Sequence, residues 1–177
     1  KHFVYASSSS VYGSNSQMPF STNHPANHPV STYAMTKASN ELMAHVYSKL
    51  YNLPTTGLRY FTVYGPYGRP DMAMFKFTEK IINGDPIDVF NKGNHQRDFT
   101  YISDIVSASV KIIKQPAKID LEWSSYNPKL STSDAPWRVY NVGNNKMIKL
   151  NYFIELIENK LGIKAKKNYL PLQPGDV

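Results

Sequence analysis

The feature that most constrains the fold is an alternation of strand, helix and strand near the start of the chain. Residues 3–7 form a short apolar run that predicts a buried strand. After a polar loop, apolar residues at helical spacing predict a helix over 33–51, with Ser31 or Thr32 as its N-cap. Residues 55–62 predict a second strand. This order predicts an α/β fold with an open parallel sheet, which binds ligands at the carboxyl ends of its strands.

The rest of the chain predicts shorter elements of both kinds. Helices are expected over 72–84, 105–114 and 151–160, and strands over 86–90, 99–102 and 139–142. Residues 115–138 show no periodicity and predict a long loop. The alternation of Lys and Glu along 155–167 predicts a solvated helix face.

Composition narrows the classes of function. A hydrophobic share of 41% and a charged share of 19% are typical of a globular domain with a core. No apolar run approaches the roughly 18–20 residues that span a bilayer. The absence of cysteine excludes disulfides and thiolate metal sites, and it favours a cytoplasmic location. The net charge of +7 comes from scattered residues, so we expect a small polyphosphate ligand rather than nucleic acid, and no membrane or metal partner.

Tyr33 and Lys37 carry the first sign of chemistry. Positions i and i+4 share one face of a helix, so the phenol and the ammonium are expected to point into the same space. A nearby ammonium favours the ionised phenolate, which makes Tyr33 a candidate general base. The pattern is common in helices, but here a run of serines, Ser7 to Ser10, follows the first predicted strand.

Four motifs in order identify a family. They are Ser7-Ser8-Ser9 leading to Val11-Tyr12-Gly13, Tyr33 with Lys37, the run LRYFTVYGP over 58–66, and the run RDFTYISD over 97–104. Together they resemble the extended short-chain dehydrogenase/reductases that epimerise or dehydrate nucleotide sugars. The resemblance implies that residues 1–65 are the C-terminal part of a Rossmann-like NAD-binding domain. Residues 66–177 are then mainly a smaller mixed α/β domain that binds the UDP-sugar, with segments that return to the sheet.

The resemblance also implies roles for the catalytic residues. Tyr33 is expected to take a proton from the sugar hydroxyl while NAD takes a hydride from the same carbon, giving a transient 4-keto sugar. Ser8 is expected to hydrogen-bond the reacting oxygen. Lys37 is expected to bind the nicotinamide ribose, and Tyr60 is assigned to the cofactor site as well.

The residues after Ser8 indicate the reaction subtype. Dehydratases and decarboxylases of this family carry acids there, whereas this chain has Ser9 and Ser10, which favours simple epimerisation. The stretch that begins at Thr62 looks like that of UDP-glucuronate 4-epimerases. We therefore expect Ser9, Ser10 and Thr62 to donate hydrogen bonds to a sugar carboxylate, with Arg69 confining the site. Epimerisation of neutral UDP-hexoses, such as UDP-glucose or UDP-GlcNAc, stays open.

Three further residues match nucleotide-binding positions of the family. Arg97 matches the arginine that binds the pyrophosphate, for which a guanidinium is well suited. Phe90 matches the position that packs on uracil, and Asp176 matches the residue that binds the ribose hydroxyls. Gln173 replaces an arginine found in many relatives.

One expected motif is not in these 177 residues. The family binds the NAD pyrophosphate with a loop of the pattern GxxGxxG, which does not occur here. We therefore expect the sequence to be the C-terminal half to two-thirds of an epimerase, inactive by itself and forming a homodimer when full-length. The alternative is a non-catalytic protein that binds a nucleotide sugar.

Overall fold

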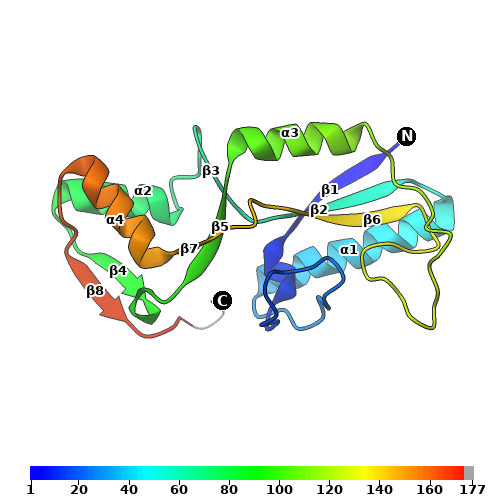
Figure 1. The fold of residues 1–177 in the computed structure, drawn as a ribbon, viewed down its shortest axis with the longest axis horizontal. Helices are drawn as coiled ribbons and strands as arrows, with labels where there is room; N and C mark the ends of the chain where they lie inside the picture. Colours follow the sequence, from blue (N-terminus) through cyan, green and yellow to red (C-terminus); the bar gives the residue numbers. More distant parts are fainter. Residues whose placement is uncertain (174–177) are drawn as a thin grey trace.

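The computed structural model describes residues 1–173 and divides their elements between two lobes (Figure 1). The first lobe is a parallel sheet of three strands in the order β1-β2-β6, formed by Phe3–Ser8, Thr55–Tyr60 and Trp137–Val142. Helix α1, Thr32–Tyr51, covers one face of this sheet, and helix α3, Ile102–Ile113, covers the other.

The second lobe holds the remaining helices and short strands. It contains α2 (Ala73–Asn83), α4 (Leu150–Leu161), β4 (Ile87–Phe90) and β8 (Lys167–Leu170), with β4 parallel to β8. Between the lobes run β3 (Thr62–Tyr64), β5 (Gln96–Tyr101) and β7 (Met147–Lys149). Each lobe has a core of its own, around Leu58 and Val142 in the first and around Ile87 and Ile154 in the second. No helix in residues 1–173 is long and apolar enough to cross a membrane.

The predicted strand–helix–strand unit is confirmed in order and type. Ser31 caps α1 by accepting a hydrogen bond from the Ala34 backbone N–H at 3.2 Å, and Asn52 ends the helix in the left-handed conformation. In the parallel register Ser8 lies opposite Tyr60, and Tyr60 lies opposite Val142. The three strands therefore end at one edge, and the serine run begins there.

Two expectations about burial were wrong. The strand over 3–7 is not buried as a whole: within β1 only Ser7 is buried, because in the described chain β1 pairs with β2 alone. The Lys/Glu stretch 155–167 is not one solvated helix face either. Helix α4 ends at Leu161, and Glu158 is only 3% exposed.

Glu158 is held by two lysines beyond the helix end. Lys164 and Lys167 each place their Nζ at 2.9 Å from its carboxylate. The hydrogen bond from Lys167 is the largest influence, and with Lys164 it outweighs burial and lowers the Glu158 pKa from 4.5 to about 2. Because the folded-state pKa lies below the unfolded one, this stabilisation is present above pH 4.5 and is lost as the pH falls toward 2.

We expect Glu158→Gln to lower the free energy of unfolding at pH 7 by about 1–3 kcal/mol, since hydrogen bonds to a charged group are removed. The difference in stability between the variant and the wild type should shrink as the pH falls from 4.5 toward 2, because the native carboxylate becomes protonated at the low end of this range. Urea unfolding across this range measures both effects. Glu155→Gln, an exposed position on the same helix, is the control and should leave the curve unchanged. An unchanged curve for Glu158→Gln would contradict the assignment.

Gly57 leaves room for the Tyr5 side chain of the neighbouring strand. A Cβ atom at this position would lie 2.5 Å from the Tyr5 hydroxyl oxygen and 2.6 Å from its ring carbon Cζ. We expect Gly57→Ala to destabilise the chain by about 1–3 kcal/mol through overpacking. In a Tyr5→Leu background Gly57→Ala should destabilise the chain less, because the Tyr5 ring and hydroxyl that the new Cβ would overlap are absent. Thermal unfolding of the wild type and the three variants tests this, and additive losses of stability would contradict it.

Candidate functional site

Ser8 lies where β1 ends and the short 3-10 turn η1, Ser9–Tyr12, begins. Its hydroxyl oxygen accepts hydrogen bonds from the backbone N–H of Ser10 at 3.2 Å and from the Ser10 hydroxyl at 2.9 Å. A hydroxyl has two acceptor positions and one proton. Ser10 therefore occupies the acceptor positions of Ser8, and the proton of Ser8 is directed elsewhere.

Tyr33 and Lys37 lie on one face of α1, near the same edge of the sheet. The Lys37 ammonium donates a hydrogen bond to the carbonyl oxygen of Ala6 at 3.0 Å, two residues before Ser8. Its nitrogen is 5.7 Å from the centre of the Tyr33 ring. The Tyr33 side chain is 56% exposed, so a ligand can reach the phenol. Helix α1 thus holds a phenol and an ammonium beside the strand that carries the serines.

A second group of predicted residues meets in a cavity of about 260 Å³ in the other lobe. Thr62 from β3, Phe90 from β4 and Arg97 from β5 all line it. Its walls also include Asp88 and an aromatic pair, Phe99 and Phe153, whose rings stack at 4.9 Å. The cavity combines apolar walls with an arginine and a carboxylate, a combination suited to a base and a phosphate.

Arg69 lies outside this cavity, on an exposed loop. Its guanidinium donates to the Asp71 carboxylate, with Nε at 3.0 Å from Oδ1. These hydrogen bonds and the charge of Asp71 raise the Arg69 pKa, and the Tyr33 phenol adds a smaller contribution in the same direction. The guanidinium is therefore occupied by Asp71, and the role of Arg69 at the site stays a prediction.

The structure does not bring the other predicted residues together as closely. The Tyr60 side chain turns toward α3, where its hydroxyl is 2.9 Å from that of Ser109, so this side chain is separate from Tyr33 and Lys37. Ser9 is the first residue of η1 and is partly buried. Asp176 lies outside the described residues.

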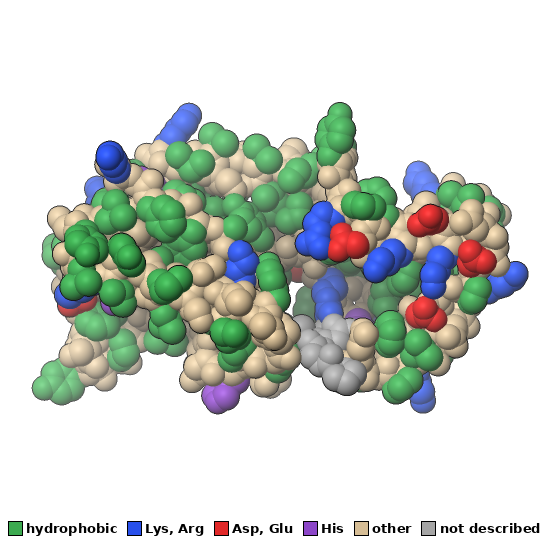
Figure 2. Space-filling view, turned by 180° about the vertical axis from the view of Figure 1, so that it is seen from behind, with side chains coloured by type: hydrophobic (Ala, Val, Ile, Leu, Met, Phe, Trp, Pro, Cys, Tyr) green, Lys and Arg blue, Asp and Glu red, His purple; other side chains and the backbone are tan. Residues whose placement is uncertain are grey.

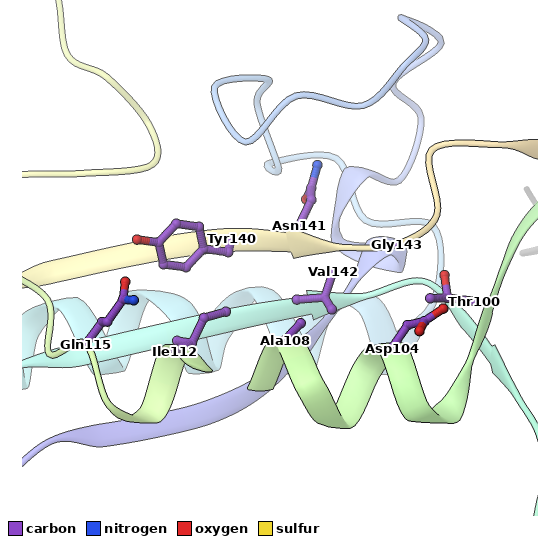
Figure 3. Close-up of a pocket in the computed structure, with 9 residues that line it drawn as sticks. All are labelled: Thr100, Asp104, Ala108, Ile112, Gln115, Tyr140, Asn141, Val142 and Gly143. Carbon is purple, nitrogen blue, oxygen red and sulfur yellow. The ribbon is translucent and has the colours of Figure 1, made fainter. Parts of the chain in front are cut away.

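A slightly larger cavity, of about 280 Å³, lies between α3 and the outer edge of β6 (Figure 3). Asp104, Ala108 and Ile112 approach it from the helix, and Tyr140 and Val142 approach it from the strand. None of the predicted site residues lines it. We therefore take the 260 Å³ cavity and the carboxyl end of β1 as the candidate functional site, because the chemically suitable side chains lie there. In residues 1–173 no three His, Cys, Asp or Glu side chains are grouped as in a metal site.

Sequence reasoning missed a buried ion pair beneath helix α1. Glu41 of α1 and Arg59 of β2 are only 6% and 3% exposed, and they form two hydrogen bonds of 2.9 and 2.7 Å. The signal was available: Glu41 is one turn beyond Lys37 on the same helix face, and Arg59 is a lone charge in a strand that is otherwise buried.

Comparison with known proteins assigns the chain to one group of enzymes. The model of the NAD dependent epimerase/dehydratase family matches residues 1–127. Protein CapI of Staphylococcus aureus is 61% identical over 177 residues, which are 100% of this chain and 53% of CapI. The probable UDP-glucuronate 4-epimerase of Rhizobium meliloti is 46% identical over 181 residues, covering 100% of this chain and 52% of that protein.

A solved structure agrees with these relatives. The UDP-glucuronic acid 4-epimerase of Bacillus cereus, crystallised with UDP-glucuronic acid and NAD, is 33% identical and superposes with a TM-score of 0.81. The match covers 99% of this chain and 50% of that one, so the chain spans about half the length of the relatives it matches. The α/β fold class and the family indicated by the four motifs are thereby confirmed. The chain belongs to the NAD dependent epimerase/dehydratase family.

Proposed function

We propose that this chain carries the catalytic and substrate-binding residues of an NAD-dependent UDP-sugar 4-epimerase that converts UDP-glucuronate to UDP-galacturonate. One observation carries the proposal: Tyr33 and Lys37 share a helix face, and the Lys37 ammonium bonds the β1 strand two residues before Ser8. This arrangement supports a base, a cation and a hydroxyl donor that act together at one strand end. Relatives named UDP-glucuronate 4-epimerase support the substrate.

In this proposal Tyr33 takes the proton from the C4 hydroxyl of the sugar. A cation 5.7 Å from the centre of its ring, the Lys37 ammonium, supports this role. Ser8 donates a hydrogen bond to the same sugar oxygen. The Ser8 proton is available for this bond because Ser10 already occupies the acceptor positions of the Ser8 hydroxyl. When the sugar presents its other face, Tyr33 returns the proton to the oxygen.

The donor set of Lys37 fits the ribose of a nicotinamide cofactor. An ammonium has three N–H donors, and the bond to Ala6 uses one of them. The remaining two suit a pair of ribose hydroxyls beside the exposed Tyr33 phenol. NAD, when bound, accepts a hydride from C4 and returns it. The assignment of Tyr60 to the cofactor site stays a prediction. Since its hydroxyl contacts Ser109, its backbone rather than its side chain would contact the cofactor.

The substrate residues divide by the part of the ligand they would hold. Arg97 and Phe90, which line one cavity, suit the diphosphate and the uracil. Thr62 lines the same cavity, and together with Ser9 it would donate hydrogen bonds to the sugar carboxylate without adding a fixed charge. The predicted donation from Ser10 would first require its hydroxyl to leave Ser8, to which it gives its one proton. Arg69 would confine the sugar beside Tyr33. Asp176, outside the described residues, is proposed for the ribose.

The test uses a chimera, because the chain spans about half the length of its relatives. Residues 1–177 replace the matching segment of Protein CapI, and the product is assayed with NAD on UDP-glucuronate, UDP-glucose and UDP-GlcNAc. We expect UDP-galacturonate from UDP-glucuronate, with the neutral sugars turned over more slowly. Turnover of neutral sugars alone would overturn the carboxylate assignment. Binding of UDP without any turnover, while CapI itself is active, would favour a non-catalytic protein.

We also infer that the enzyme is a homodimer that pairs through α1. The inner face of this helix buries Ala34, Glu41, Ala44 and Ser48, while its outer face is apolar. The outer residues Leu42, Met43, Val46, Tyr47, Leu50 and Tyr51 are all at least half exposed, and Figure 2 shows hydrophobic side chains gathered on this side of the molecule. A helix that turns its apolar face to the surface indicates an interface.

We expect the double variant Leu42→Lys/Leu50→Lys to convert a dimeric chimera into a monomer, since two charges would be buried at the interface. Analytical ultracentrifugation measures the change. Ile82→Lys, at an equally exposed apolar position on α2, is the control and should leave the dimer intact. A dimer that survives the double variant would contradict pairing through α1.

A further inference from the structure

The buried pair Glu41–Arg59 has a third member. The Ser7 hydroxyl, 3% exposed, donates a hydrogen bond to the Glu41 carboxylate at 2.5 Å. The same oxygen of Glu41 accepts from Arg59 Nε, and the other oxygen accepts from Arg59 Nη2. Charges are costly to bury, and an ion pair in a core often adds little net stability. A requirement for fixed geometry explains the pair better than stability does.

The position of this group supports that explanation. Tyr33, Lys37 and Glu41 follow one another at intervals of four residues, so they share one stripe of α1. Lys37 contacts β1 at Ala6, and Glu41 contacts β1 at Ser7. The helix that carries the proposed base is therefore joined to the strand at two successive residues, directly before Ser8.

Arg59 extends the same connection across the sheet. It lies opposite Ser7 in the parallel register of β1 and β2, and its guanidinium lies 4.8 Å from the centre of the Tyr12 ring. The Tyr12 hydroxyl in turn donates to the Asn141 side chain of β6 at 2.7 Å. Tyr12 ends the turn that holds Ser9 and Ser10. One network, buried except at the partly exposed Asn141, thus connects all three strand ends, the serine turn and α1.

We propose that Glu41 is a positioning residue for the catalytic group. Its carboxylate, oriented by Arg59, fixes Ser7 and thereby sets the distance between Ser8 on β1 and Tyr33 and Lys37 on α1. This inference rests on the proposed function, since it assumes that these three residues act on the sugar. Small displacements of a proton donor and a base reduce the rate without weakening the binding of a nucleotide held elsewhere.

Ser7→Ala is the sharpest test of the proposal. Removing Glu41 leaves the Arg59 charge buried without its carboxylate, so that variant can fail to fold. Ser7→Ala keeps the ion pair and removes only the link to the catalytic strand. Ser48→Ala is the matched control: Ser48 is also a fully buried serine between α1 and the sheet, and within the described residues its hydroxyl has no hydrogen-bond partner.

In the CapI chimera, at a temperature where circular dichroism shows every variant folded, we expect Ser7→Ala to lower kcat about tenfold, the size of one hydrogen bond to a charged group. KM for UDP-glucuronate should stay unchanged, because the 260 Å³ cavity is untouched. Ser7→Thr, which keeps the hydroxyl, should restore most of the rate. Ser48→Ala should change neither constant.

The outcomes separate the two proposals. An inactive wild-type chimera beside active CapI contradicts the proposed function. An active chimera in which Ser7→Ala keeps the wild-type kcat overturns only the role of Glu41. An equal loss of kcat in Ser7→Ala and Ser48→Ala also overturns it, since the effect would then follow from any loss of a buried hydroxyl under α1.

Discussion

Replacing Tyr33 with phenylalanine should lower kcat of the chimera by about 10²–10⁴-fold, the contribution that general acid–base catalysis makes. The substitution removes one hydroxyl oxygen from a half-exposed ring, so it takes nothing from the core. Within residues 1–173 the proposed mechanism gives no other group the role of accepting the C4 proton, because Lys37 donates to Ala6 and Ser8 is proposed as a donor. The rate of UDP-galacturonate formation measures the effect.

Binding of UDP should be unchanged in the same variant. The proposed nucleotide cavity is lined from β3, β4 and β5, and Tyr33 is not among its residues. Calorimetry with UDP checks this, and Tyr152→Phe, a half-exposed tyrosine on α4, serves as the control. A kcat within a few fold of the wild type would remove Tyr33 from the mechanism. A loss of thermal stability comparable with that of a core variant would indicate a structural role instead.

Replacing Arg97 with glutamine should weaken UDP binding by about a hundredfold or more. A guanidinium makes charge-assisted, bidentate hydrogen bonds with phosphate, and each such bond contributes about 1.5–3 kcal/mol. Arg97 is the arginine that lines the 260 Å³ cavity, beside Phe90 and Thr62. Because the diphosphate is common to every UDP-sugar, the loss should be the same for UDP-glucuronate and UDP-glucose. Calorimetry with UDP and with both sugars measures it.

Two comparison variants make this prediction specific. Arg97→Lys keeps the positive charge but lacks the planar guanidinium that binds phosphate with two hydrogen bonds. It should therefore keep only part of the wild-type affinity for UDP. Arg138→Gln is the same chemical change on β6, where Arg138 is near Tyr140 and outside the cavity, and it should bind UDP as the wild type does. Equal losses in Arg97→Gln and Arg138→Gln would show that net charge, rather than a phosphate site, governs binding.

The sequence predicted the longest elements well because their determinants are local. Helix α1 has its N-cap at Ser31 and its end before Pro54, both of which are recognisable in the chain. Strands β7 and β8 were missed for the opposite reason. Each is only three or four residues long, and each is defined by pairing with a distant strand, β5 and β4 respectively. Short segments of this kind carry no periodic signal of their own.

Burial was the least predictable property. The apolar residues within 3–7 predict a buried strand. However, Phe3 is 48% exposed, and the polar residue Ser7 is buried. The charged residues Glu41, Arg59 and Glu158 look like surface residues and are all buried with partners. A side chain is buried when other elements cover it, and which elements do so depends on the topology of the sheet.

Three features of this protein can be recognised in the sequence: the phenol and ammonium four residues apart, the serine run after a strand, and the motifs that mark the family. They can be recognised because each depends on neighbours along the chain. The folded structure was needed to find that Thr62, Phe90 and Arg97 share one cavity and that Glu41 links Ser7 to Arg59. Those contacts join residues far apart in sequence. The parallel register of β1 and β2 sets Ser7 opposite Arg59, whereas the cavity residues come together from β3, β4 and β5.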